Sequence, residues 1–152
     1  MIKVIDIFAG PGGLCEGFAA VTDGKGKSVF DVALSIEKDE QAHATLLLRT
    51  FFRQFPDGPP ADYYRRLRGE IDQDSLFKAY PAEAKRATSR SWHATLGVGG
   101  QDRATVRKRI DQTLGSDTNW VLIGGPPCQA YSIAGRSRNQ GKADYDPAKD
   151  EC

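Results

Sequence analysis

The sequence has no long apolar run, no paired cysteines and no leader pattern at its start. Among its 152 residues, no stretch approaches the roughly 20 apolar residues that a membrane-spanning helix needs. No basic segment followed by an apolar one opens the chain, so we expect a soluble protein that is not secreted and has no membrane partner. The three cysteines, Cys15, Cys128 and Cys152, show no CxxC spacing, which argues against a disulfide scaffold or a zinc ribbon and predicts no metal site.

One-sided charge is also missing, because the net charge is only +1. A composition of 39% hydrophobic and 27% charged residues excludes a disordered tail, a collagen-like repeat and a coiled coil, and the length suits one domain. The middle of the chain, residues 49–115, is mildly basic and rich in arginine, with Tyr63, Tyr64 and Trp92 between the charges. This pattern suits a segment that faces nucleic acid, and it equally suits a solvated helical surface.

Two β-branched runs, each followed by a helical pattern, open the chain. Residues 3–8 form the first run, which stops at the turn residues 10–13, and a helix is expected to begin near Gly12. Residues 29–36 form the second predicted strand, and Asp39 is a suitable cap for the helix that follows. This order of strand, turn and helix predicts an α/β fold with a parallel sheet flanked by helices.

The rest of the chain shows fewer clear elements. A loop is predicted over residues 56–62, and residues 63–115 have the pattern of helices and connectors, including a helix over Arg103–Leu114. No third strand is visible in that stretch. A last strand is predicted over residues 120–123, and it runs into the turn sequence Gly-Gly-Pro-Pro.

The glycine-rich turn after the first strand is a candidate cofactor loop. Ligands of parallel α/β sheets bind beyond the carboxyl ends of the strands, and glycines there allow the backbone to approach a ligand closely. Glu37 ends the second strand, 24 positions after Gly13, and its carboxylate can accept both hydroxyls of a ribose. A tight turn beside a solvated glutamate would explain the same residues without any ligand.

Two missing residues indicate the type of cofactor. A dinucleotide fingerprint would place a third glycine at position 15, which is Cys15, and no Walker lysine follows the turn. The turn therefore lacks the features of a pyrophosphate cradle. This favours a nucleoside without phosphates, such as S-adenosylmethionine.

The turn after the last strand places a cysteine at a second strand end. Cys128 follows two prolines, which fix the backbone, and it can present its sulfur to the same crevice as the glycine turn. Phosphatase chemistry would need an arginine at position 134, which is alanine, and disulfide exchange would need a second cysteine nearby. A nucleophile beside a nucleoside cofactor remains, and the alternative is a buried, inert thiol.

Together the two turns resemble two motifs of the cytosine-C5 DNA methyltransferases. Residues 6–13 (Asp-Ile-Phe-Ala-Gly-Pro-Gly-Gly), followed by Gly17 and Phe18, resemble the first motif of the family, and residues 127–129 (Pro-Cys-Gln) resemble the fourth. The resemblance implies a Rossmann-like fold that binds S-adenosylmethionine through a cofactor loop over residues 6–18. The implied cofactor-binding residues are Phe8, Ala9, Gly10, Gly12, Gly13, Glu37 and Pro127.

The same resemblance implies a mechanism. Cys128, on a catalytic loop over residues 124–138, would add to C6 of a cytosine that has left the double helix, so that C5 could take the methyl group. Double-stranded DNA would be the partner. The resemblance also implies a bacterial-type cytoplasmic enzyme that belongs to a system with a cognate restriction endonuclease. The implied DNA contacts are Gln129, Ser132, Arg136 and Arg138.

The sequence also departs from the pattern of the family. Lys38 stands where a residue that packs on adenine is common, and the acid of the third motif has Glu70 as its candidate, with no strand before it. No Glu-Asn-Val follows Cys128, and a target-recognition region is absent from residues 1–152. We therefore expect the chain to be the N-terminal part of a methyltransferase catalytic domain, with an incomplete fold. We expect this part alone to methylate inefficiently, and the C-terminal part of the enzyme to act in trans.

Other functions are compatible with these motifs. An RNA cytosine-C5 methyltransferase would carry the same residues, and a non-catalytic module of the same fold would bind the cofactor or nucleic acid without reaction. A nicotinamide-dependent oxidoreductase is disfavoured by Cys15 at the position of the third glycine.

Overall fold

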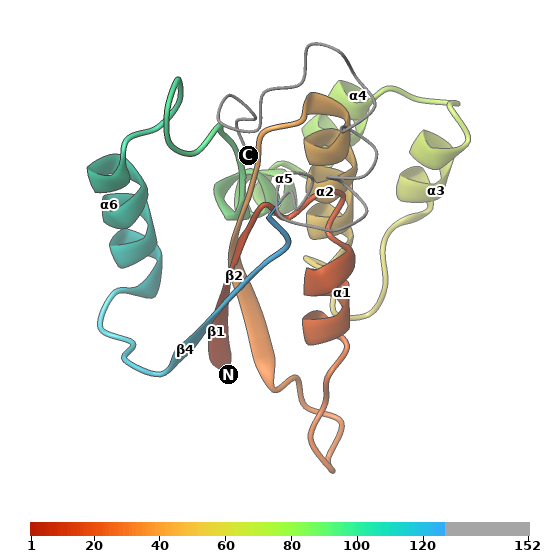
Figure 1. The fold of residues 1–152 in the computed structure, drawn as a ribbon. Coiled ribbons are helices and arrows are strands. Elements are labelled where there is room, and N and C mark those ends of the chain that lie inside the picture. The colour runs from red at the N-terminus through yellow and green to blue at the C-terminus, as the bar shows by residue number, and fades with distance from the viewer. Residues whose placement is uncertain (127–152) are drawn as a thin grey trace, which may run out of the picture.

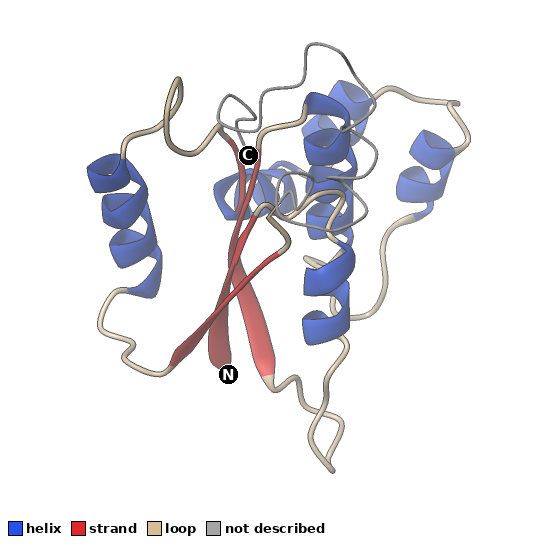
Figure 2. Ribbon diagram, in the orientation of Figure 1, coloured by secondary structure: helices blue, strands red, loops and turns tan. Residues whose placement is uncertain are grey.

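Four parallel strands form the sheet at the centre of the described structure, a computed structural model that describes residues 1–126. In chain order the strands are β1 (Ile2–Ile7), β2 (Phe30–Glu37), β3 (Ser91–His93) and β4 (Trp120–Gly124). They lie in the spatial order β3-β2-β1-β4, and every pairing is parallel. Helices flank this sheet, which confirms the predicted α/β class (Figure 2).

Helices connect the strands and cover both faces of the sheet. In residues 1–126 they are α1 (Gly13–Ala19), α2 (Glu40–Phe52), α3 (Ala61–Leu67), α4 (Gln73–Ala79), α5 (Pro81–Arg90) and α6 (Arg103–Leu114). Figure 1 shows α6 on one side of the strands and α1 and α2 on the other. Within the same part of the chain, no helix combines the length and the apolar character that crossing a bilayer requires.

Alternating side chains of β1 explain the two covered faces. Val4 packs in a cluster with side chains of α1 and α2, and its neighbour Ile5 packs in a second cluster with side chains of α6. Successive residues of a strand point to opposite faces, and a parallel sheet has both faces buried. A third cluster, centred on Phe51, joins α2 to the short helices α3, α4 and α5.

Aspartate caps begin three of the helices. Asp39, Asp72 and Asp102 each accept a hydrogen bond from the backbone N–H three positions later, at 2.7 to 2.9 Å. Such a cap satisfies one of the N–H groups that have no partner within the helix. The predicted cap at Asp39 and the predicted helix over Arg103–Leu114 are both confirmed.

Two predictions about the middle of the chain are wrong. A third strand does exist there: β3 has three residues and pairs with β2 from Ser35 to Glu37. The sequence conceals it because it follows α5 without a turn residue and has no β-branched run, so its pairing with β2 alone makes it a strand. The loop predicted over 56–62 is also too long, since α3 begins at Ala61, directly after Pro60.

Candidate active site

The strand order places two strand ends side by side at the centre of the sheet. The chain passes from β1 outward to β2 and β3, and it then returns to β4 on the other side of β1. Ligands of open α/β sheets bind beyond the carboxyl ends of the strands at such a switch point. The turn after β1 and the turn after β4 are therefore neighbours, and these are the two turns that the sequence singles out.

The turn after β1 has a strained and closely bonded backbone. Phe8 has a φ of 57°, in the left-handed region that residues other than glycine rarely adopt. The N–H of Ala9 donates to the carbonyl of Ile36 in β2 (3.0 Å), and the N–H of Gly12 donates to the carbonyl of Ala9 (3.0 Å). Strain of this kind persists where surrounding bonds enforce it, and it clusters at ligand sites.

Glu37 joins this turn to the second strand. It is the last residue of β2, and only 8% of it is exposed. Its Oε2 accepts the N–H of Gly10 (2.7 Å), and its Oε1 accepts the N–H groups of Lys38 (2.8 Å) and Asp39 (2.7 Å). The carboxylate therefore has a fixed orientation between the glycine turn and the start of α2.

The hydrogen bonds of Glu37 limit how many ribose hydroxyls its carboxylate can accept. An ionised carboxylate has about four acceptor positions, and backbone N–H groups occupy three of those of Glu37. One ligand hydroxyl can therefore bond to Oε2 while the turn stays as it is. For both hydroxyls of a ribose to bond Glu37 Oε2, the hydrogen bond from the N–H of Gly10 to that oxygen has to break.

The end of β4 lies directly against the end of β1. Gly124 pairs with Ile7, and a Cβ at Gly124 would lie 2.4 Å from the carbonyl oxygen of Ile7, so a side chain there would displace the strand. Gly125, the next residue, lies near the backbone of Phe8, with 3.9 Å between a Cβ built at Gly125 and the carbonyl oxygen of Phe8. The predicted site residues Pro127, Cys128, Gln129, Ser132, Arg136 and Arg138 lie outside the described residues.

A buried polar layer lies beneath the glycine turn. Asp6 of β1 is fully buried, and neither of its carboxylate oxygens has a hydrogen-bond partner within residues 1–126. The thiol of Cys15, also fully buried, donates to the carbonyl of Gly12 (3.3 Å) and accepts from the hydroxyl of Ser35 (3.9 Å). Burial raises the pKa of both the Asp6 carboxyl and the Cys15 thiol, so this thiol is an inert part of the interior.

The sequence of the chain is similar to that of a known enzyme. The chain is 31% identical over 151 residues to the type II methyltransferase M.Bpa9945I of Bacillus paralicheniformis, with 89% of this chain and 32% of that protein aligned. It is similar to a methyltransferase. The parallel sheet with its helices is accordingly consistent with a Rossmann-like methyltransferase fold. The chain spans about a third of the length of the curated relative that it matches. No protein-family model matches the chain, and no solved structure does.

Gly12 is the position of the turn where glycine is required. Its φ is 90°, and a Cβ built there would lie 3.0 Å from Leu46 Cδ1. We expect Gly12→Ala to lower the free energy of unfolding by about 1–2 kcal/mol, because alanine is strained in the left-handed region and presses on the core. Urea unfolding followed by circular dichroism measures this change.

Gly17 provides the matched control for that substitution. It lies within α1, and a Cβ built there would meet no heavy atom within 4 Å. We expect Gly17→Ala to raise the free energy of unfolding by about 0.5–1 kcal/mol, since alanine is the better helix former. Equal effects of the two substitutions would show that the turn does not need glycine at position 12.

The burial of the Asp6 carboxyl leads us to expect that the folded state becomes less stable as the pH rises. Burial raises the pKa of its carboxyl, the charge of Glu37 adds to the shift, and the neighbouring Cys15 and Arg53 offset part of it. The folded state therefore holds this proton more tightly than the unfolded state. The resulting stabilisation is complete below the unfolded-state pKa of about 3.9 and is lost as the pH rises through the raised value.

The variant Asp6→Asn cannot titrate and is expected to remove that dependence. From pH 4.5 to pH 8 it should gain stability relative to the wild type, since the wild type loses with rising pH the stabilisation that the raised pKa of Asp6 gives at low pH. Urea unfolding at pH 4.5 and pH 8 measures the difference, and the exposed Asp74→Asn is the control. A wild type whose stability rises over this interval, with Asp6→Asn parallel to it, would contradict the prediction.

The carboxyl end of β3 supplies residues that the sequence analysis missed. His93 ends β3 opposite Glu37 in the pairing register, and its Nε2 lies 2.9 Å from the carbonyl oxygen of Lys38. Its ring stacks on that of His43 in α2, with 4.9 Å between the ring centroids. The signal in the sequence was weak, because a strand of three residues has no recognisable periodicity.

Glu70, the candidate acid of the third motif, follows α3, and its carboxylate pairs with the Arg68 guanidinium.

Four arginines of the basic middle segment form ion pairs with acids of the same segment. Several of its arginines contact acids one helical turn away, as in the pairs Arg65–Asp62, Arg86–Glu83 and Arg107–Asp111. Of the interleaved aromatics, Tyr63 is buried, and Trp92 packs toward α6 beneath Arg109 at 5.8 Å. This is the arrangement expected of a solvated helical surface.

Proposed function

We propose that the chain binds S-adenosylmethionine at the carboxyl ends of β1 and β2 and forms part of a DNA cytosine-C5 methyltransferase. The observation that carries the proposal is the buried Glu37 carboxylate, bonded to the N–H of Gly10 across two strand ends and with one acceptor position left. A ribose hydroxyl suits that position. The similarity to a type II methyltransferase supports methyl transfer as the reaction.

The glycine turn fits a nucleoside cofactor. A Cβ at Gly10 or Gly13 would meet no heavy atom within 4 Å, so the backbone there has room for a ligand beside it. The proposed contacts are Glu37 with the ribose and the turn residues with the rest of the nucleoside, and Pro127 is proposed to border the reactive end. When bound, S-adenosylmethionine supplies the methyl group. Phe8 shapes the turn through its left-handed backbone, and Ala9 and Gly12 shape it through the hydrogen bonds described above.

Cys128 is the proposed nucleophile. It follows Gly124 by four residues, so the chain keeps it within about 14 Å of the end of β4. Its thiolate would add to C6 of an unstacked cytosine, which makes C5 nucleophilic enough to take the methyl group. Loss of the proton from C5 and elimination of the thiolate would then restore the ring and free Cys128.

Double-stranded DNA is the proposed partner, contacted by Gln129, Ser132, Arg136 and Arg138. A further polypeptide region is proposed to complete the enzyme and to pack against the described sheet beside β4. β4 is one of the two edge strands of the described sheet, and Trp120 and Leu122 line an apolar groove of about 560 Å³ between β4 and α6. A cognate restriction endonuclease is proposed to share the DNA target.

Isothermal titration calorimetry with two ligands tests the cofactor. We expect S-adenosylhomocysteine, the product form of the cofactor, to bind with one site per chain and NADH to show no heat of binding. The physical reason is that the turn lacks the third glycine of a pyrophosphate site. Saturable binding of NADH without binding of S-adenosylhomocysteine would reject the proposal in favour of a nicotinamide-dependent enzyme.

A further inference from the structure

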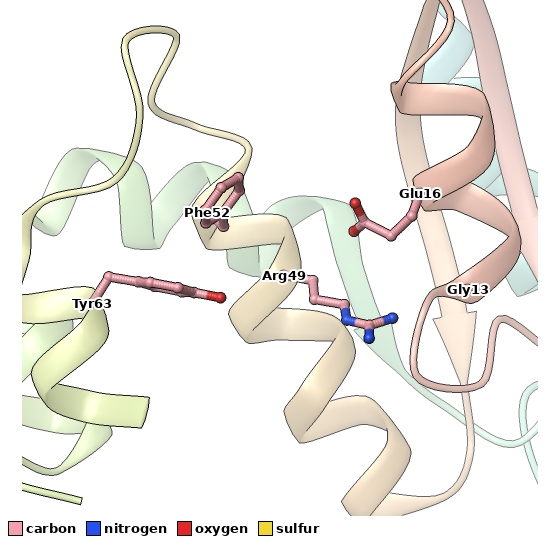
Figure 3. A pocket seen from close by; sticks show the side chains of 5 residues that line it. All are labelled: Gly13, Glu16, Arg49, Phe52 and Tyr63. Carbon is pink, nitrogen blue, oxygen red and sulfur yellow. The ribbon is translucent and has the colours of Figure 1, made fainter. Parts of the chain in front are cut away.

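A cavity opens between α1, α2 and α3. Its described lining comes from three helices: Gly13 and Glu16 of α1, Arg49 and Phe52 of α2, and Tyr63 of α3. Its volume is about 450 Å³, within the range of small-molecule sites. Figure 3 shows the side chains of Arg49 and Glu16 between α2 and α1, and the hydroxyl of Tyr63 directed from α3 toward α2. Gly13 also belongs to the proposed cofactor turn, whereas Glu37, the proposed ribose ligand, is not among these lining residues.

The polar groups of this cavity have unused hydrogen-bonding capacity. Tyr63 is only 7% exposed, yet its hydroxyl has no hydrogen-bond partner within residues 1–126. Arg49 donates one N–H to the carbonyl of Pro11 (3.0 Å) and has no carboxylate partner in that part of the chain. Glu16 bonds Arg53 through Oε1, which leaves Oε2 as an acceptor. Each of these groups can therefore form a further hydrogen bond to a ligand that enters the cavity.

An aromatic surface accompanies these polar groups. Phe52 is 39% exposed, and its ring meets that of Tyr63 edge-to-face with 5.3 Å between the centroids, which leaves a face of the Phe52 ring uncovered by that contact. A flat heterocycle can stack on such a face. A purely apolar ligand would leave three polar groups without partners, and a bare phosphate would not use the ring.

We infer that this cavity binds one nucleotide, separately from the cofactor. The base stacks on Phe52 and donates to Glu16, and the phosphate contacts the guanidinium of Arg49 while the Tyr63 hydroxyl bonds the sugar or base edge. The preference for a nucleotide over other flat anions rests on the proposed function, since a DNA-modifying enzyme meets unstacked nucleotides. The nucleotide is either free or part of a single strand.

Calorimetric titration of the full chain with free dCMP, and anisotropy with a labelled ten-nucleotide single strand, test the site in saturating S-adenosylhomocysteine. We expect Tyr63→Phe to weaken nucleotide binding about fivefold and Arg49→Gln about tenfold. Tyr64→Phe and Arg107→Gln are the matched controls, because neither residue lines the cavity, and both should change binding less than about twofold. Circular dichroism melting verifies that every variant is folded.

The outcomes separate this site from the cofactor site. Binding of dCMP that is sensitive to Tyr63→Phe supports a mononucleotide pocket, and the same sensitivity with the oligonucleotide alone supports a strand-borne nucleotide. Failure of both probes, equal effects of Tyr63→Phe and Tyr64→Phe, or displacement of S-adenosylhomocysteine by dCMP overturns the inference. If S-adenosylhomocysteine itself does not bind while the Tyr63-dependent binding persists, the proposed function fails and the nucleotide pocket stands.

Discussion

A Glu37→Gln variant is expected to bind S-adenosylhomocysteine about 10- to 100-fold more weakly than the wild type. The carboxylate accepts three backbone N–H groups and has one position for a ligand hydroxyl. Hydrogen bonds to a charged group are worth about 1.5–3 kcal/mol each. A glutamine amide also turns its NH₂ group toward at least one of those N–H donors, so the turn at Gly10 loses its fixed position as well.

Glu40→Gln is the control for this experiment. Glu40 is an exposed acid in the first turn of α2, three residues after Glu37, and the substitution removes the same charge without touching the turn. Calorimetric titration of both variants gives the affinities, and circular dichroism verifies the fold. Equal affinity of Glu37→Gln and Glu40→Gln would remove Glu37 from the cofactor site.

A Cys128→Ser variant is expected to form no covalent adduct with DNA that contains 5-fluorocytosine. Fluorine at C5 cannot leave as the proton does, so the bond between sulfur and C6 is not released and the wild-type adduct accumulates. Serine is a far weaker nucleophile at neutral pH because its hydroxyl is not appreciably ionised. We expect the loss to be at least about 1,000-fold in the rate of adduct formation.

The adduct is measured as a band of reduced mobility on a denaturing gel, with protein in excess over DNA and S-adenosylmethionine present. Cys152→Ser is the control, because it removes a thiol that belongs to neither motif. An adduct that persists in Cys128→Ser but is lost in Cys152→Ser would show that Cys152, and not Cys128, is the nucleophile. Absence of an adduct both with this chain and with a longer polypeptide that contains it would contradict the covalent mechanism.

The well-predicted parts of the fold depend on residues that are close together in the sequence. The cap at Asp39 is three residues from the N–H that it accepts, and α6 has the bounds that its local pattern predicts. The first two strands are each displaced by one residue from their predicted bounds. By contrast, β3 is a strand because it pairs with β2 more than fifty residues away, and no local pattern could indicate that pairing.

The candidate site divides in the same way. The residue types at the two strand ends were visible in the sequence, whereas the distribution of hydrogen bonds around Glu37 was not. The sequence suggested a carboxylate free to accept both ribose hydroxyls, and the structure shows three of about four acceptor positions already occupied. The unpartnered carboxylate of Asp6 was equally hidden, since burial is a property of the packed chain.

The sequence by itself determined the α/β class, the glycine turn after the first strand and the acid at the end of the second. These follow from periodicity and from the backbone preferences of glycine, which act over a few residues. Only the tertiary structure decided that Gly124 lies against Ile7, that Glu37 bonds Gly10, and that three helices line the open cavity at Arg49. Each of these contacts joins residues distant in the chain, and packing of the whole sheet with its helices sets the distances between them.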